Sequence, residues 1–169
     1  MDRNAEIRAA QERIVTVFTQ RPQTALSTSK GSAGIEDGLT CTYRQGDLEA
    51  VMDMSKVMGG DEKGPTPGFF IRAGLAGCVA IGIKLTAVRE AVPLESIDVG
   101  VEMDFDDGAI FGVGSNKAAP LATRLTITLQ TSAPWETVTA MVERALDADP
   151  YYLALRDAQD VSARLVQAG

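Results

Sequence analysis

Cys78 is the residue whose type and position best fit a chemical role in this chain of 169 residues. The chain contains no histidine, which excludes Ser-His-Asp and Cys-His catalysis and histidine-based metal sites. Its two cysteines, Cys41 and Cys78, are too few for a disulfide framework or a four-thiolate zinc site. We therefore expect a thiol nucleophile, with no metal and no bound cofactor.

Cys78 lies near the middle of a predicted apolar helix. Its neighbours at helical spacing are all aliphatic or glycine: Ile71, Gly74, Leu75, Ile81, Gly82 and Leu85. Each glycine inside a helix costs about 1 kcal/mol relative to alanine. The stripe Gly74, Cys78, Gly82 therefore indicates either close backbone packing or space left beside the sulfur for a substrate. Burial raises the pKa of a thiol, so a reactive Cys78 needs a cation or donor from another element.

Cys41 lies in the segment GLTCTYR, whose alternation predicts a strand. Leu39, Cys41 and Tyr43 share one face, and we expect Cys41 to point into the core. A second interpretation is a thiol that resolves oxidised Cys78, although no spacing in the sequence brings the two cysteines together.

Three other motif-like strings have simpler explanations. Residues 27–30 match S-x-x-K but lack the partner motifs of a β-lactamase and a helix start at the serine. Residues 104–108 lack the glycine spacing and the twelfth-position glutamate of a calcium loop. Residues 112–117 lack the third glycine of a dinucleotide loop. We interpret them as a strand edge, a hairpin turn and a connection.

The elements that must position Cys78 form one predicted domain over 1–169. Periodicity predicts an amphipathic helix at 4–19 whose apolar face docks on another element, and helical spacing recurs at 134–146. Alternation with turn residues predicts strands at 94–105 and 121–131. For the tail, 152–166, we expect a short helical turn and a last strand. The predicted parts are an N-terminal helical extension (1–22), N-terminal strands (24–58), a central helix (66–90), and C-terminal strands and helix (94–166).

Charge and hydropathy exclude several classes of partner. The formal charge of −7 and the lack of a basic cluster argue against nucleic-acid binding. The first residues are charged and contain no apolar signal segment, so we expect a cytoplasmic protein. Arg72 interrupts the apolar stretch 69–83 and Lys84 ends it, leaving it short of about 18 apolar residues. We expect a buried core helix and no membrane segment.

The string GPTPGFFIRAGLAGCVAIGIKLTAVREAVPLESIDVGVEMDF, residues 64–105, resembles the OsmC/Ohr family. The shared features are a Gly/Pro-rich loop, a long central helix leading through small residues to a cysteine, a proline-containing loop and a valine-rich strand. The resemblance covers roughly residues 24–166. It implies an α+β fold with antiparallel sheets packed around long central helices in an intertwined homodimer. It also implies reduction of organic hydroperoxides, with Cys78 as the peroxidatic cysteine.

The chain departs from the family pattern at two positions. Asp149 precedes Pro150 where the family's enzymes carry the resolving cysteine, and Gly68 follows Pro67 where they carry a glutamate. A carboxylate near Cys78 would raise the thiol pKa. The family's activating arginine has a candidate in Arg44, with Lys30 and Arg21 as further candidates. Arg72 is a poor candidate, because it lies six residues before Cys78 on another face of the helix.

Two functions remain open from the sequence. The first is a one-cysteine peroxidase, in which an external thiol, or less favourably Cys41, reduces oxidised Cys78. The second is a non-catalytic dimeric binding or regulatory protein with an apolar pocket beside Cys78. Both predict an apolar ligand, because no receptor for phosphate or carboxylate is evident.

Overall fold

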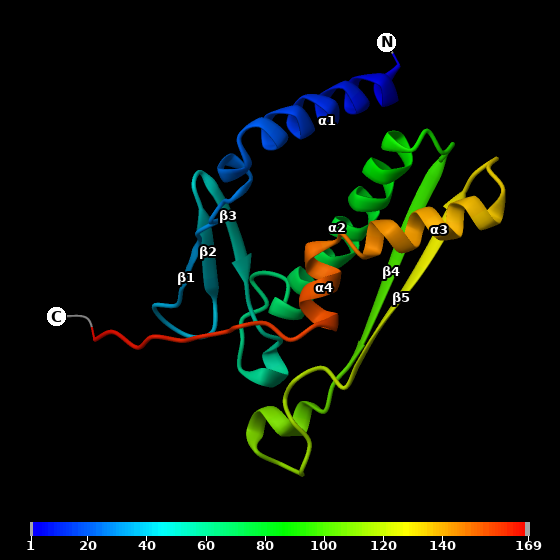
Figure 1. Ribbon diagram of the computed structural model, residues 1–169. Coiled ribbons are helices and arrows are strands. Elements are labelled where there is room, and N and C mark those ends of the chain that lie inside the picture. Colours follow the sequence, from blue (N-terminus) through cyan, green and yellow to red (C-terminus); the bar gives the residue numbers. More distant parts are fainter. Residues whose placement is uncertain (1, 168–169) are drawn as a thin grey trace.

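The computed structural model describes residues 2–167 and has an α+β architecture (Figure 1). The helices are α1 (Arg3–Gln20), α2 (Pro67–Arg89), α3 (Trp135–Leu146) and α4 (Pro150–Arg156). The strands are β1 (Ser32–Gly34), β2 (Cys41–Gln45), β3 (Leu48–Met52), β4 (Ser96–Asp104) and β5 (Ala122–Gln130). Short 3-10 helices lie at Pro22–Ala25, Lys56–Met58 and Asp107–Phe111.

Helix α2 is the centre of the molecule. Pro67 at its first position, after Thr66 in extended conformation, fits a helix start. Leu75, Val79, Ile83 and Ala87 follow at intervals of four residues and are almost fully buried. They pack with α3, which contributes buried Val138, Met141 and Ala145, and with the inner face of β4 and β5. The expected central helix and the inward face of α3 are confirmed.

Strands β4 and β5 form a separate antiparallel pair whose burial alternates residue by residue. Ile97 faces Leu129, and Val99 faces Ile127, on the side that packs on α2 and α3. The other side is polar and carries Arg124 bound to Asp104. This alternation is that of a sheet with one covered face, which confirms both predicted strands.

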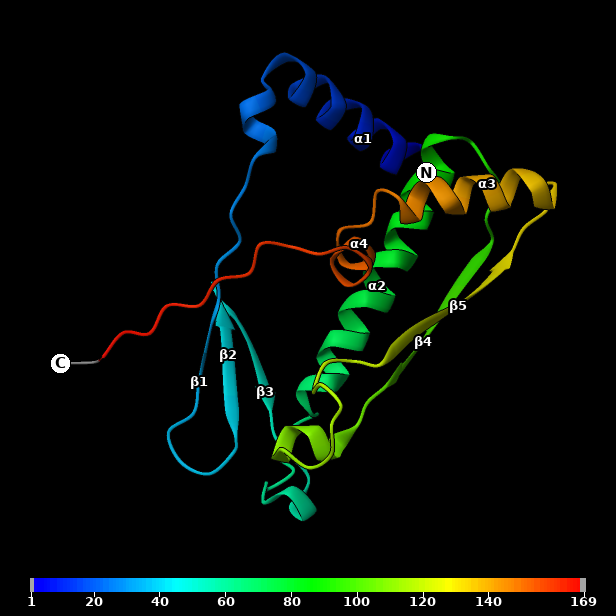
Figure 2. The same ribbon diagram turned by 60° about the horizontal axis from the view of Figure 1, so that its bottom comes forward.

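The N-terminal strands form a three-stranded antiparallel sheet in the order β1-β2-β3. The sheet stands to one side of α2 in both views (Figures 1 and 2). None of its residues is fully buried. Cys41, paired with Met52, is therefore only half-buried and lies outside the hydrophobic core, so the expectation that it points into the core was wrong.

Helix α1 docks less completely than its periodicity predicts. The Arg8 side chain donates to the Val88 carbonyl and the Gln11 side chain to the Leu85 carbonyl, both near the end of α2. The second half of α1 runs past this contact, and Ile14 and Phe18 are 52% and 42% exposed. The expectation that this apolar face is docked was wrong for the second half of α1 within the described chain, because the contact with α2 lies in the first half, where Ile7 is half-buried.

Two further expectations need correction. The last strand is absent, since residues 158–167 carry no regular structure and form no backbone hydrogen bonds with a strand edge. Helix α2 is also long and apolar enough to cross a membrane by length and composition. The stretch is thus not too short, although core helices of soluble proteins meet the same criterion and its face with Leu75 and Ile83 is buried in the core.

Candidate functional site

The site around Cys78 is built where α4 crosses α2. Asp149 and Pro150 form a favourable helix start, because an N-cap carboxylate satisfies free backbone amides and proline fits the first turn. Asp149 Oδ1 accepts hydrogen bonds from the amides of Tyr151 at 3.1 Å and Tyr152 at 2.8 Å. The Asp149 residue is only 3% exposed. The cap therefore fixes a buried carboxylate against the middle of α2.

The second carboxylate oxygen, Asp149 Oδ2, is buried and has no partner of hydrogen-bond geometry among residues 2–167. It points at α2, where a Cβ added to Gly82 would lie 3.3 Å away. The same carboxylate lies close enough to the Cys78 thiol to raise the pKa of that thiol. An unpartnered buried acceptor is uncommon in folded proteins, so this oxygen marks the site.

Burial raises the pKa of the Cys78 thiol, and the neighbouring Asp149 carboxylate raises it further. The carboxylate acts by favouring the protonated thiol and by repelling a thiolate. The backbone amide of Tyr151 acts in the opposite direction because it can donate to a thiolate. No cationic group of the described chain contributes. In this single chain, Cys78 is held as a neutral thiol.

The glycine stripe now has a physical explanation. A Cβ at Gly74 would meet no atom within 4 Å, whereas one at Gly82 would crowd Asp149 Oδ2. Neither glycine is needed for close backbone packing within this chain. Open space therefore explains Gly74, and the close approach of the Asp149 side chain explains Gly82.

A groove of about 300 Å³ lies one turn of α2 before Cys78. Its lining is almost wholly apolar and comes from α2 and α4: Phe70, Ile71, Gly74, Leu75, Tyr151, Ala154 and Leu155. Tyr151 connects the groove to the site, because its side chain lines the groove while its amide acts on Cys78. An apolar molecule in this groove would lie about one helical turn from Cys78.

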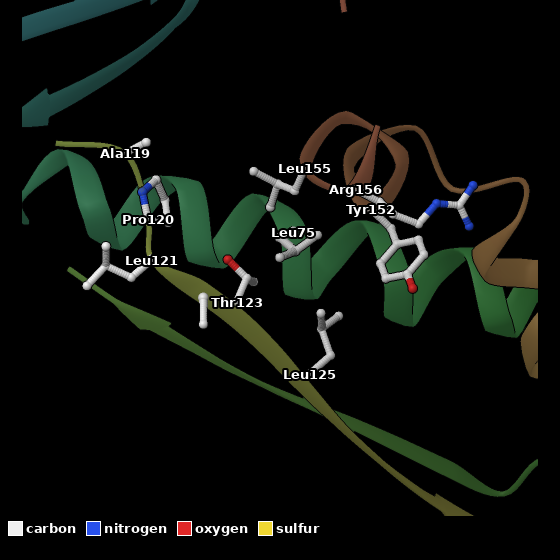
Figure 3. Close-up of a pocket in the computed structure, with 10 residues that line it drawn as sticks. Leu75, Ala119, Pro120, Leu121, Thr123, Leu125, Tyr152, Leu155 and Arg156 are labelled. Atoms are coloured by element: carbon white, nitrogen blue, oxygen red, sulfur yellow. The ribbon is translucent and has the colours of Figure 1, made fainter. Parts of the chain in front are cut away.

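A second cavity, of about 450 Å³, opens between α2, β5 and α4, where Leu75, Leu125 and Tyr152 converge (Figure 3). Arg156 lies at its edge, with its guanidinium bound to Asp147 and Asp157. Neither cysteine lines this cavity or the smaller groove. The smaller groove is the better candidate for a ligand that reacts with Cys78, because it is lined by Gly74, one helical turn before Cys78, and by Tyr151, whose amide acts on the thiol.

The structure does not bring Arg44 to Cys78 within one chain. Arg44 lies on β2 and pairs with Glu49 at 2.9 Å, on the sheet that stands apart from α2. It is not among the groups that shift the thiol pKa. Arg72 instead extends over Gly68, with Nη1 3.1 Å from where a Cβ on Gly68 would lie. The role of Arg44 as an activator stays a prediction.

From the sequence we could state what Asp149 would do if it lay near Cys78, but not that it lies there, since the two residues are far apart in the chain. The amide of Tyr151 was missed entirely. The available signal was the Asp-Pro start of a short helix, which directs the next amides toward the cap. Among the described residues, no group of three or more His, Cys, Asp or Glu side chains is arranged to hold a metal ion.

Comparison with known proteins gives one consistent result. Residues 60–164 match the model of the OsmC-like protein family. The structure is similar to an OsmC-like protein from Mycoplasma pneumoniae, with a TM-score of 0.66 and 14% identity over 77% of this chain and 88% of that one. It is also similar to an organic hydroperoxide resistance protein from Legionella pneumophila, with a TM-score of 0.54 and 22% identity over 78% and 90%.

A third similar structure is the organic hydroperoxide resistance protein OhrB of Bacillus subtilis, with a TM-score of 0.51 and 20% identity over 77% of this chain and 91% of that one. No curated protein matches the chain significantly. At these identities the structural similarities establish the fold. The activity has to be argued from the site.

Proposed function

The chain belongs to the OsmC-like protein family, and on this premise we propose that it reduces organic hydroperoxides with Cys78 as the attacking thiol. The observation that carries the proposal is the position of Cys78. The residue is half-buried on α2, one helical turn from an apolar groove that suits the hydrocarbon part of such a substrate. Two of the structural relatives are organic hydroperoxide resistance proteins.

The proposed reaction begins at the sulfur. Cys78 attacks the outer oxygen of the hydroperoxide, an S–O bond forms and the O–O bond breaks. The leaving alkoxide takes up the thiol proton and departs as an alcohol, and Cys78 becomes a sulfenic acid. An external thiol then attacks the sulfur and expels water, and a second thiol releases Cys78 by disulfide exchange. No metal or cofactor enters this cycle.

Cys78 needs activation for this chemistry, because burial and Asp149 raise its pKa. We propose that a homodimer provides it, with the cation supplied by the second copy and Arg44 as the candidate. Two features support a dimer. Ile71 and Ile81 on α2 are 48% and 62% exposed, and the sheet of β1, β2 and β3 has no fully buried residue. A cytoplasmic location would supply the reducing thiols.

The test is consumption of cumene hydroperoxide by the purified protein with dithiothreitol or dihydrolipoamide. Cys78→Ser should abolish turnover, and Cys41→Ser, at the other free cysteine, should leave it unchanged. Arg44→Gln should lower the rate of Cys78 oxidation while sedimentation still reports a dimer. Absence of turnover in the wild-type protein, or full turnover in Cys78→Ser, would contradict the proposal.

A second candidate is a dimeric binding or regulatory protein that holds an apolar ligand beside an unreactive Cys78. The carboxylate of Asp149 favours it, since this group opposes thiolate formation. The two candidates differ in one measurement. Rapid, stoichiometric formation of sulfenic acid at Cys78 with equimolar lipid hydroperoxide argues for the enzyme, and its absence argues for the binding protein.

A further inference from the structure

Asp149 Oδ2 is the one buried side-chain oxygen among residues 2–167 that lacks a hydrogen-bond partner. The position of this carboxylate is well defined, because its other oxygen caps α4 by accepting two backbone hydrogen bonds. Oδ2 lies against Gly82, one helical turn after Cys78, and its carboxylate is close enough to the Cys78 thiol to raise the pKa of that thiol. A partner that appears during the reaction of Cys78 would satisfy it.

We propose that Asp149 Oδ2 accepts a hydrogen bond from the hydroxyl of oxidised Cys78, holds it as a neutral sulfenic acid, and thereby protects it from irreversible oxidation until an external thiol arrives. This inference rests on the proposed function, since it concerns the product of the first step at the same sulfur. It assigns Asp149 as a positioning residue that acts through Cys78. Asp149 thus protects by hydrogen bonding where a resolving thiol would protect by forming a disulfide.

The chemistry of the second oxidation gives the reason for protection. A sulfenic acid is oxidised further when its deprotonated form attacks a second hydroperoxide. In that step a second S–O bond forms, the O–O bond breaks, and the sulfur becomes a sulfinic acid while an alcohol leaves. A fixed carboxylate disfavours a second negative charge beside it and favours a group that donates a hydrogen bond to it. The neutral sulfenic acid is that group.

The reaction with an external thiol does not depend on that charge. The thiol attacks the sulfur, an S–S bond forms, and the hydroxyl leaves as water after taking the proton of the attacking thiol. The carboxylate therefore slows the second oxidation selectively and leaves the reduction open. Gly82 fits this role, because a side chain there would crowd the Oδ2 atom that the new hydroxyl must reach.

The test compares two competing outcomes of oxidation in the full-length protein. Wild type, Asp149→Asn and Asp147→Asn are exposed to increasing excess of cumene hydroperoxide without reductant. Intact mass spectrometry measures the fraction carrying two added oxygens, and dimedone labelling measures the sulfenic acid. The Asp149→Asn variant keeps an Oδ1 acceptor for the cap of α4 but replaces Oδ2 by an amide donor. Asp147→Asn is the matched control, since this exposed carboxylate pairs with Arg156 at 3.1 Å.

We expect Asp149→Asn to raise the ratio of sulfinic to sulfenic product about ten-fold, the factor that corresponds to a change of one unit in the pKa of the Cys78 sulfenic acid. Asp147→Asn should keep the wild-type ratio. Gly82→Ala is a second variant that keeps both Cys78 and Asp149 but displaces the carboxylate oxygen, so it should raise the ratio in the same direction. Equal ratios in wild type and Asp149→Asn, or a lower ratio in Asp149→Asn, would overturn the proposal.

The failure of this inference is distinguishable from failure of the proposed function. If cumene hydroperoxide does not oxidise wild-type Cys78, the proposed function fails. Hydrogen peroxide at higher concentration then forms the sulfenic acid, and the same ratio is measured in the same variants. Should Asp149→Asn unfold, as judged by circular dichroism, Gly82→Ala alone decides the outcome.

Discussion

Replacing Asp149 separates two opposing contributions of one carboxylate to stability. Oδ1 caps α4 through two amides, and Oδ2 is buried without a partner. Loss of an N-cap side chain costs about 1 kcal/mol, within a range of about 0.5–2. A buried unsatisfied polar atom costs about 1–3 kcal/mol. Asp149→Ala removes both effects, so its net change in unfolding free energy should be small.

Asp149→Ser provides the comparison that isolates the cap. The serine hydroxyl keeps an acceptor for the amides at the start of α4 and removes the orphan oxygen. The serine variant should therefore be about 1 kcal/mol more stable than the alanine variant, and at least as stable as the wild type. For a chain of this length, that difference corresponds to about 2–4 °C in Tm. Urea unfolding at neutral pH, with both cysteines kept reduced, measures it.

Two results would refute this reasoning. Equal stability of the serine and alanine variants would mean that the cap contributes nothing to the stability of the fold. Destabilisation of both variants by more than about 2 kcal/mol would mean that Oδ2 has a strong stabilising partner, and that its orphaned state in one chain is misleading. Asp147→Ser is the control for loss of a carboxylate in the same segment, and a single exposed ion pair there contributes about 0–1 kcal/mol.

Three further predictions concern α2 and its C-terminal end. The pKa of Cys78 is raised above its ordinary 9.0, so the folded state binds the thiol proton more tightly than the unfolded state. The free energy of unfolding should therefore fall as pH rises above about 9. In urea titrations, Cys78→Ser should lack this part of the decline. Gly74→Ala should stabilise the protein by about 1 kcal/mol through helix propensity. Gly82→Ala should stabilise it by less, because only this alanine meets Asp149 Oδ2. An equal gain in Tm for the two variants would contradict this prediction. Arg144 lowers the pKa of Glu90 through a 2.6 Å ion pair. The ion pair should stabilise the fold by about 0.5–1 kcal/mol above the ordinary pKa of 4.5, and this stabilisation should vanish as pH falls below that value. The stability of Glu90→Gln should match that of the wild type in acid but not at pH 7.

The sequence predicted those elements whose periodicity is satisfied within one chain. The four-residue spacing of Leu75, Val79 and Ile83 and the alternation of β4 and β5 gave the right type of element, because each buried face meets another part of the same core. Two predictions failed where the described chain offers no packing partner. The apolar residues in the second half of α1 remain exposed, and residues 158–167 pair with no strand edge. Periodicity reports that a face can be buried, and does not say what buries it.

The site shows the same limit in another form. Cys78 was identified from residue type and position, since the chain has no histidine and the helix is apolar. The proximity of Asp149 depends on how α4 crosses α2, which is a long-range contact that no local spacing encodes. Arg44 illustrates the converse, because a plausible residue type lies on a sheet that stands apart from the thiol in one chain. Composition selected the nucleophile, and only the tertiary structure could supply its electrostatic neighbour.

The two effects proposed for Asp149 lower the rate of hydroperoxide reduction but raise the resistance of Cys78 to irreversible oxidation. By raising the thiol pKa, the carboxylate lowers the fraction of reactive thiolate and slows the first step. By accepting the sulfenic hydroxyl, it slows the second step, which is the irreversible one. On the proposed function, the protein should therefore turn over slowly and tolerate a large excess of hydroperoxide. Asp149→Asn should reverse both properties, giving faster initial consumption and earlier inactivation in one progress curve. If Asp149→Asn consumed hydroperoxide faster without earlier inactivation, only the effect on the first step would remain assigned to Asp149.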